Sequence, residues 1–169
     1  MPDIQARVSS LYDTHRDGIY RFVVAQGLSP AVAQEVTQDV FVDLLVALQE
    51  GKEMNSERAW LYTVAGRAVV DHWRRERPRM WAELDANPGA TADVPSRQQS
   101  PEAQAEHKER LRRVSAALLR LTRERRLCLQ LRMHGLRYRE IAKVLHISTS
   151  TVAEWLIASI DRLRDEADG

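Results

Sequence analysis

The chain has 169 residues, of which 44% are hydrophobic and 29% are charged, a balance typical of a folded, soluble protein. No apolar run approaches the roughly 20 residues that span a bilayer, and the N-terminus lacks the basic and apolar blocks of a signal peptide. A single cysteine, Cys128, excludes a disulfide framework within the chain, so we expect a cytoplasmic protein without membrane insertion, built as one ordinary domain or two small ones.

The net charge of +1 conceals an uneven distribution along the chain. Residues 1–81 carry 10 Lys/Arg and 11 Asp/Glu, whereas residues 102–164 carry 14 Lys/Arg and 7 Asp/Glu. The basic C-terminal half is therefore a candidate for contact with a polyanion such as DNA. A solvated basic helix surface is the alternative explanation of the same excess.

The residues before position 82 predict three helices, because apolar side chains recur there at helical spacing. Gly27 follows the first apolar stripe. Ser29 then offers a capping hydroxyl directly before Pro30, which is typical of a helix start. The expected helices lie at about residues 4–26, 30–50 and 57–77, and we expect the third to turn inward Trp60, Leu61, Val64, Ala65, Ala68 and Val69.

Residues 82–101 break this pattern. They contain Pro88, Pro95, Pro101 and Gly89 and almost no large apolar residue. Such a segment cannot bury enough surface to offset the entropy lost on ordering. We interpret it as a flexible linker between two small domains, residues 1–81 and 102–169.

Four further helices are predicted after the linker, which makes the expected fold all-α, with two small helical domains. The apolar residues that mark the first two are Leu111, Val114, Leu118 and Leu121, then Leu127, Leu129, Leu131 and Met133. Gly135 closes the second helix. The last two helices are expected at about residues 138–145 and 149–165.

The stretch at residues 138–152 is the most specific pattern, because it predicts a helix-turn-helix motif. Two steeply crossing helices need a small residue at their closest approach, and Ala142 supplies it. Ser148 can cap the second helix, whose exposed start, residues 148–154, can then enter a major groove. A plain helical hairpin with a serine-rich turn is the alternative. The residues spaced to close the core between the two helices are Ile141, Leu145, Ile147, Val152 and Leu156.

These residues resemble sigma factors, the bacterial transcription initiation factors. The C-terminal half resembles sigma domain four at residues 135–142 (Gly-Leu-Arg-Tyr-Arg-Glu-Ile-Ala), 145–148 (Leu-His-Ile-Ser) and 151–152 (Thr-Val). The N-terminal half resembles sigma domain two at residues 33–41 and in the segments Ala59-Trp-Leu-Tyr-Thr-Val-Ala65 and Asp71-His-Trp-Arg-Arg75. With two domains and no third between them, the chain is similar to the compact extracytoplasmic-function (ECF) group.

The resemblance implies a protein that binds RNA polymerase core and directs it to promoter DNA. In that family the second helix docks on the clamp helices of the β′ subunit, while domain four binds the β flap and the minus-thirty-five element. The polymerase-binding residues implied here are Glu35, Gln38, Asp39, Phe41 and Asp43. The residues of domain four implied in DNA binding are Arg137, Tyr138, Arg139, Lys143, Ser148, Thr149, Ser150, Thr151 and Glu154.

The resemblance also implies that domain two opens and holds the minus-ten element. Cations are needed for the backbone and stacking surfaces or pockets for unpaired bases. The loop at residues 52–56 is the implied base pocket. Trp60 and Trp73 are either stacking surfaces or core residues, and helical spacing favours the core for Trp60. The cations of domain two implied in DNA binding are Arg67, Arg74, Arg75, Arg77 and Arg79.

Several positions depart from the family pattern. Gly66 and Arg67 stand where the family usually has Arg-Asn, and Leu121-Thr122 replaces Leu-Pro. On the recognition helix, residues 153–155 read Ala-Glu-Trp instead of Lys-Ser-Arg, and residues 158–159 read Ala-Ser instead of Arg-Ala. Glu154 can accept a hydrogen bond from a cytosine amino group but repels phosphate. We therefore expect an unusual minus-thirty-five preference or weaker reliance on that element, with Trp155 as a candidate for inward packing.

Nothing in the sequence favours catalysis. The five histidines lack metal-ligand spacing, and there is no HExxH motif, cysteine pair or glycine-rich phosphate loop. We expect no enzyme activity, metal or cofactor, and we interpret Cys128 as a small core residue. Two other functions stay open: a helix-turn-helix regulator that acts without polymerase, and a sigma-derived protein-interaction module. Members of the family are often held inactive by an anti-sigma protein, which is a further expected partner.

Overall fold

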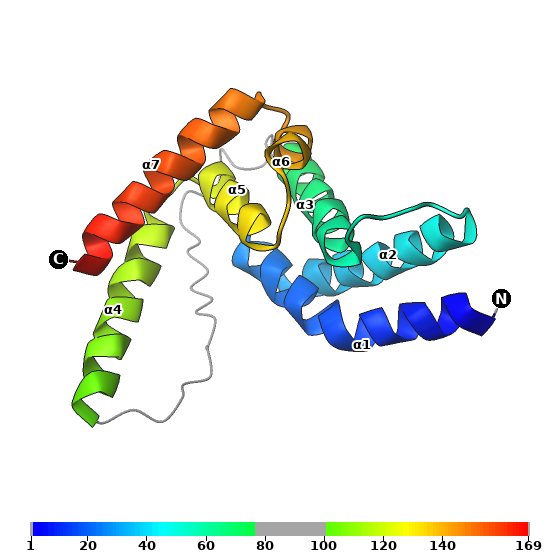
Figure 1. Ribbon diagram of the computed structural model, residues 1–169, viewed down its shortest axis with the longest axis horizontal. Helices are drawn as coiled ribbons and strands as arrows, with labels where there is room; N and C mark the ends of the chain where they lie inside the picture. The colour runs from blue at the N-terminus through cyan, green and yellow to red at the C-terminus, as the bar shows by residue number, and fades with distance from the viewer. Residues whose placement is uncertain (1, 77–100, 169) are drawn as a thin grey trace.

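The computed structural model describes residues 2–76 and 101–168, and Figure 1 shows their arrangement. Within these ranges the chain forms seven helices and no strand. The all-α prediction is therefore confirmed. The helices are α1 (Pro2–Ala25), α2 (Pro30–Gln49), α3 (Glu57–Glu76), α4 (Pro101–Leu119), α5 (Arg123–Met133), α6 (Tyr138–Leu145) and α7 (Thr149–Asp168).

The helix boundaries follow from local capping. The hydroxyl of Ser29 accepts a hydrogen bond from the Val32 amide at 3.3 Å, so α2 begins at Pro30 as the sequence predicts. Thr122 caps α5 in the same way, through the Arg125 amide at 3.4 Å. Gly135 ends the turn after α5 with a φ of +92°, a conformation that costs glycine little.

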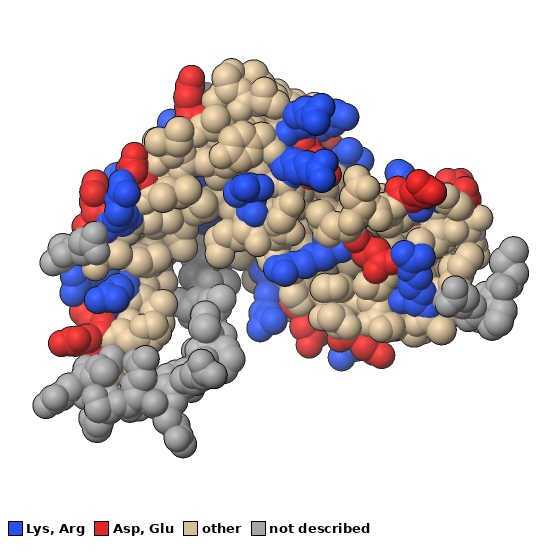
Figure 2. Space-filling model, in the orientation of Figure 1, with Lys and Arg blue, Asp and Glu red and all other residues tan. Residues whose placement is uncertain are grey.

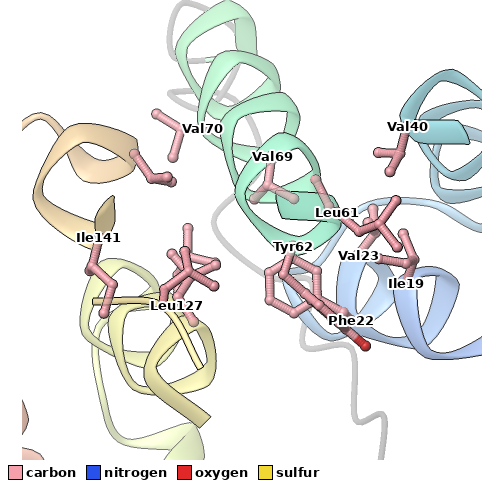
Figure 3. Packing of buried hydrophobic residues seen from close by; sticks show 14 of the residues in the cluster. Ile19, Phe22, Val23, Val40, Leu61, Tyr62, Val69, Val70, Leu127 and Ile141 are labelled. Carbon is pink, nitrogen blue, oxygen red and sulfur yellow. The ribbon is translucent and has the colours of Figure 1, made fainter. Parts of the chain in front are cut away.

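The N-terminal unit consists of α1, α2 and α3. α1 and α2 form a hairpin, and α3 lies across both (Figure 1). The buried side chains of Ile19, Val40 and Leu61 come from the three different helices and meet in one core, with no exposed surface. Figure 3 shows Leu61 directed from α3 toward Ile19 and Val23 on α1.

The C-terminal unit consists of α4 to α7. α4 and α7 run side by side, and α5 and α6 pack against α7 (Figure 1). Leu127, Leu131, Val144 and Val152 are fully buried between these helices. The guanidinium of Arg126 donates to the carbonyls of Leu118, Leu119 and Leu121 at 3.1 to 3.3 Å, which caps the C-terminal end of α4 and ties it to α5.

The two units share one continuous core. α3 packs against α5 and α6 as well as against α1 and α2, and in Figure 3 it runs between Ile19 and Val40 on one side and Leu127 and Ile141 on the other. Among the described residues, the buried hydrophobic side chains of both units belong to one cluster, apart from Ala47 and Ala117. The direct packing of the two units is a feature that the sequence pattern did not predict.

Three details differ from the sequence prediction. Met133 was expected in the apolar stripe of α5, but 73% of it is exposed, while Leu131 in the same turn is fully buried. Trp60 is half-buried at the surface of α3 instead of being a full core residue. α4 begins at Pro101, the last residue of the expected linker, and the other residues of that linker lie outside the described ranges. The proposed domain boundaries stay a prediction.

Candidate nucleic-acid interface and docking face

The crossing of α6 and α7 has the geometry expected of a helix-turn-helix motif. Ala142 is buried at the crossing with 7% exposure. His146 ends α6 in the left-handed region with a φ of 56°, and the Ile147 amide returns to the Ala142 carbonyl at 3.1 Å. The Ser148 hydroxyl accepts from the Thr151 amide at 3.1 Å, so it caps α7 as the sequence predicts.

The start of α7 carries a compact group of hydroxyls. The Ser148 oxygen lies 2.9 Å from that of Ser150 and 2.8 Å from that of Thr151. Ser148, Thr149, Ser150 and Glu154 are exposed and Thr151 is half-buried. The expected reading face of the recognition helix is thus accessible, and it presents hydroxyls and one carboxylate.

Cations flank this face on α6. Arg137, Arg139 and Lys143 are exposed, and Figure 2 shows Lys and Arg side chains gathered where α6 lies. The Arg137 amide donates to the Glu140 carboxylate at 2.6 Å, which secures the first turn of α6. Tyr138 is 41% exposed, with the Arg132 guanidinium 5.4 Å from its ring centroid. The residues of domain four named from the sequence are thus exposed, apart from the half-buried Thr151, and they come from α6, its N-cap and the start of α7.

Trp155 does not belong to the reading face. It is half-buried against the core, and the Arg125 guanidinium of α5 lies 5.8 Å from its ring. The inward packing that the sequence offered as one possibility is what the structure shows. Compared with the family pattern, this position therefore lacks a cation on the expected reading face and adds no aromatic ring to it.

Domain two presents cations on α3. Arg67, Arg74 and Arg75 are exposed, and the Arg75 side chain donates to the Asp71 carbonyl at 3.4 Å. Arg77 and Arg79, also named from the sequence, lie outside the described residues. The three described cations extend along the solvent side of α3.

A surface hollow of about 400 Å³ adjoins Arg67. Lys52, from the loop at residues 52–56, lines it together with Trp60, and the Lys52 ammonium lies 5.8 Å from the Trp60 ring centroid. The Trp60 ring gives this hollow an aromatic surface, and its two cations share the lining with three carboxylates. Its other lining residues are Asp43, Val46, Ala47, Glu50, Val64, Ala68 and Asp71.

Trp73 is a core residue and not a stacking surface. It is 6% exposed, and its indole nitrogen donates to the Gln26 carbonyl at 3.3 Å. The Arg123 guanidinium of α5 covers its ring at 4.8 Å from the centroid. The alternative in which Trp73 stacks on bases is therefore wrong for this arrangement of the two units.

The candidate docking face lies on α2. Glu35, Gln38, Asp39 and Asp43 are exposed, as expected. Phe41, expected to contact the polymerase, is 5% exposed and meets the Tyr12 ring edge-on at 4.9 Å. That expectation for Phe41 needs correction, because its ring faces the core, where it fixes α2 on α1.

Two exposed valines complete this face. Val42 is 58% exposed and Val46 is 45% exposed. They follow Gln38 at intervals of four residues, so they share its side of the helix. We define the α2 docking face as Glu35, Gln38, Asp39, Val42, Asp43 and Val46. The four-residue spacing of Val42 and Val46 from Gln38 is the sequence signal from which their place on this face could have been predicted.

Other kinds of site are not found in the described part of the chain. Residues 2–76 and 101–168 hold no group of three or more His, Cys, Asp or Glu side chains placed to bind a metal ion. Among the helices of these ranges, none combines the length and the apolar character needed to cross a membrane.

Comparison with known proteins agrees with the geometry. Residues 11–79 match the family described as sigma-70 region 2, and residues 111–156 match sigma-70, region 4. The chain is similar to the ECF RNA polymerase sigma factor SigX of Bacillus subtilis, with 28% identity over 143 residues, covering 84% of this chain and 74% of SigX. It is also 28% identical to the RNA polymerase sigma factor YlaC of the same organism, over 86% of this chain and 83% of YlaC. The ECF sigma factor SigK of Mycobacterium tuberculosis is 28% identical over 97% of this chain and 87% of SigK.

Proposed function

The chain belongs to the sigma-70 family, in its ECF group of RNA polymerase sigma factors, and we propose that it binds RNA polymerase core through α2 and reads promoter DNA through α6 and α7. One observation carries the proposal: a single chain presents both an exposed acidic and apolar helix face and a helix-turn-helix with an accessible reading face. Sigma factors are initiation factors without enzymatic activity, so the reaction itself belongs to the polymerase.

The α2 docking face is the proposed contact with the β′ clamp helices. Val42 and Val46 supply apolar area, and exposed apolar side chains beside polar ones are typical of protein interfaces. Glu35, Asp39 and Asp43 surround them with negative charge. A basic partner surface would gain complementary charge pairs there, which speed association and fix its orientation.

Domain four is the proposed reader of the upstream duplex and the partner of the β flap. Residues 148–154 enter the major groove, while Arg137, Arg139 and Lys143 contact phosphates on either side. Ser150 and Glu154 are the side chains proposed to meet base edges. Glu154 accepts hydrogen bonds only, so it favours a cytosine amino group.

Domain two is the proposed site of strand opening. Arg67, Arg74 and Arg75 neutralise the backbone of the separated strand. The hollow between Lys52 and Trp60 is the proposed place of an unpaired base, because the aromatic ring provides a stacking surface. Asp43, Glu50 and Asp71 also line it, so the backbone phosphates are assigned to the exposed arginines of α3 and not to the hollow.

Run-off transcription with core polymerase tests the proposal. The wild-type chain is expected to start transcription from a subset of promoters in a genomic library, and Asp39→Arg is expected to abolish it. Glu106→Arg, a charge reversal at an exposed position of α4, is the matched control and is expected to keep activity. Silence of the wild-type chain across the library would contradict the proposal.

Promoter binding by the isolated protein, measured beside run-off transcription, separates the proposal from a helix-turn-helix regulator that acts without polymerase. Such a regulator binds promoter duplex as an isolated protein, and a change at Asp39 leaves that binding intact. It also gives the α2 docking face no role. An anti-sigma protein is a further proposed partner, and its binding would silence transcription in the same assay.

A further inference from the structure

His146 has an uncommon backbone conformation. It lies between α6 and α7 with a φ of 56° and a ψ of 43°, in the left-handed region. Among the described residues it is the only one other than glycine with a positive φ. In this region the Cβ atom of an L-residue comes too close to the following carbonyl oxygen, a free-energy cost that glycine avoids. The side chain at this position therefore calls for an explanation.

The turn itself imposes the conformation. The His146 amide donates to the Ala142 carbonyl, and the Ile147 amide donates to the same carbonyl at 3.1 Å. These two hydrogen bonds end α6 and lead the chain into α7. A glycine would make the same bonds, because both use main-chain atoms alone. The motif thus needs a left-handed residue here, but it does not need an imidazole.

The imidazole has no role in the packing of the C-terminal unit. His146 is exposed, and it belongs neither to the hydrophobic core nor to the residues packed against it. Within residues 2–76 and 101–168 its ring takes part in no hydrogen bond, ion pair or aromatic contact. Strained residues whose conformation the surrounding structure enforces cluster at functional sites. The position of His146 relative to the proposed DNA contacts is therefore informative.

His146 lies beside the surfaces proposed to meet promoter DNA. It precedes Ser148, where the reading face begins, by two residues, a separation of about 7 Å at most. It follows Lys143, a proposed phosphate contact, by three residues. Figure 1 shows the short connection between α6 and α7 that contains it, and Figure 2 shows Lys and Arg side chains gathered over α6. The major groove is only about 12 Å wide, so a residue next to a helix that enters the groove lies within reach of phosphates.

An imidazole is suited to a phosphate oxygen. It carries an N–H donor in its neutral as well as in its charged form, and hydrogen bonds to an anion are stronger than those between neutral groups. The sequence from Lys143 to Thr151 contains no carboxylate, so no acidic side chain of the turn opposes a phosphate there.

We propose that His146 contacts a phosphate of the promoter duplex, at the edge of the major groove that the start of α7 enters. The imidazole N–H donates to a phosphate oxygen, and this hydrogen bond holds the turn between α6 and α7 on the DNA backbone. His146 thereby lowers the stability of the folded chain and raises its affinity for promoters. The inference rests on the proposed function of domain four and adds one contact to it.

The test measures these two effects separately. Promoter binding is measured for the full chain with core polymerase, and thermal unfolding is measured for the chain alone. His146→Gly is expected to raise the midpoint of unfolding, because the strain is relieved, and to weaken promoter binding roughly three- to tenfold. His107→Ala, which removes an exposed imidazole from α4, is the matched control and is expected to leave promoter binding unchanged. Promoter binding by His146→Gly as tight as that of the wild type would overturn the proposal.

Two variants of nearly equal shape test the chemistry. Asparagine and aspartate both tolerate the left-handed conformation, but only the amide of asparagine donates a hydrogen bond, since the ionised carboxylate only accepts. His146→Asn is therefore expected to keep most of the affinity that His146→Gly loses, and His146→Asp is expected to lose more than His146→Gly. Equal promoter affinities of the Asn and Asp variants would refute the phosphate contact.

Replacement of single phosphates by uncharged methylphosphonates tests the contact from the side of the DNA. At one position beside the minus-thirty-five element, the replacement is expected to weaken binding of the wild type clearly more than that of His146→Gly. Equal effects on both proteins at every position would contradict the proposal. Arg139→Ala shows which inference has failed. If it weakens promoter binding and His146→Gly does not, only the role of His146 is wrong, whereas a wild-type chain that binds no promoter with core polymerase overturns the function of domain four as well.

Discussion

The imidazole of His134 lies flat on the phenol ring of Tyr62, with ring centroids 3.5 Å apart and an angle of 8° between the planes. The Phe22 ring meets both of them edge-on, at 5.2 and 5.7 Å. Because Tyr62 belongs to α3 and His134 ends α5, the stack joins the two units. Burial lowers the pKa of His134 to about 4, and the neighbouring Arg58 and His15 act in the same direction.

The stack predicts a specific pH dependence of stability. The pKa of His134 is about 4 in the folded chain and 6.5 when the group is fully solvated. Between these values the unfolded chain binds more protons, so the free energy of unfolding decreases as the pH falls from about 6.5 to about 4. The loss is expected to be well below the roughly 3.4 kcal/mol that such a shift would give a fully buried group, because solvent screens a partly exposed ring. Thermal unfolding of the wild type and of His134→Gln, measured between pH 7.5 and 4.5, checks this.

Other groups also titrate in that range, so the comparison of the two proteins is decisive. The wild type is expected to lose more thermal stability than His134→Gln on acidification. Parallel profiles would show that His134 does not couple folding to pH.

The α2 docking face predicts a second set of variants. Val42→Glu is expected to weaken binding to core polymerase at least tenfold, about 1.4 kcal/mol, because it places a charge in the apolar centre of the face. The fold should be unaffected, since Val42 is 58% exposed. Competition with a labelled sigma factor for core polymerase measures the affinity. The control is Gln104→Glu, which adds the same charge at an exposed position of α4.

Arg139 is expected to act through phosphate contact alone. Arg139→Ala should weaken binding to different promoters by a similar factor, because a phosphate contact carries no sequence information. It should also reduce the slope of log affinity against log salt by about 1. Holoenzyme binding to a panel of promoters at several salt concentrations provides both quantities. A loss confined to one promoter class would contradict the phosphate assignment.

Glu154 is expected to behave differently. Glu154→Ala should relax the preference at one base pair of the minus-thirty-five region, at a cost of about 1–3 kcal/mol for promoters with the preferred base. Promoters that lack this base should bind equally well or better, because a carboxylate near phosphate is removed. Selection from a randomised upstream sequence, with Ser150→Ala in parallel, distinguishes the two side chains. An unchanged selected sequence would exclude a base contact by Glu154.

Cys128 is expected to be inert in the folded chain. It has no exposed surface, and burial raises its pKa to about 11 from an ordinary 9.0. At about pH 8 the thiolate form of Cys128 is therefore about 100-fold less abundant in the folded chain than in the unfolded chain. Iodoacetamide should alkylate the folded chain slowly in buffer. It should alkylate the chain unfolded in guanidinium chloride as fast as a free cysteine under the same conditions. Rapid reaction of the folded chain would place Cys128 outside the core.

Local sequence alone determined the helices and the helix-turn-helix motif. Ser29, Thr122 and Ser148 cap helices through hydrogen bonds to amides within three residues, and such bonds depend on few neighbours. The exposed cations of α6 and the exposed hydroxyls at the start of α7 were equally predictable, since polar side chains lie away from the apolar side of an amphipathic helix.

The tertiary structure decided which apolar side chains meet. A helical period identifies an apolar side but not its extent or the element that covers it, so Met133 was expected inside and lies outside. The resemblance placed Phe41 at the polymerase contact, although its ring lies inside. The fit of Gly66 against Leu131 and Val144 depends on three helices from two units. No sequence period encodes such a contact, because its free energy arises only when segments far apart in the chain are brought together.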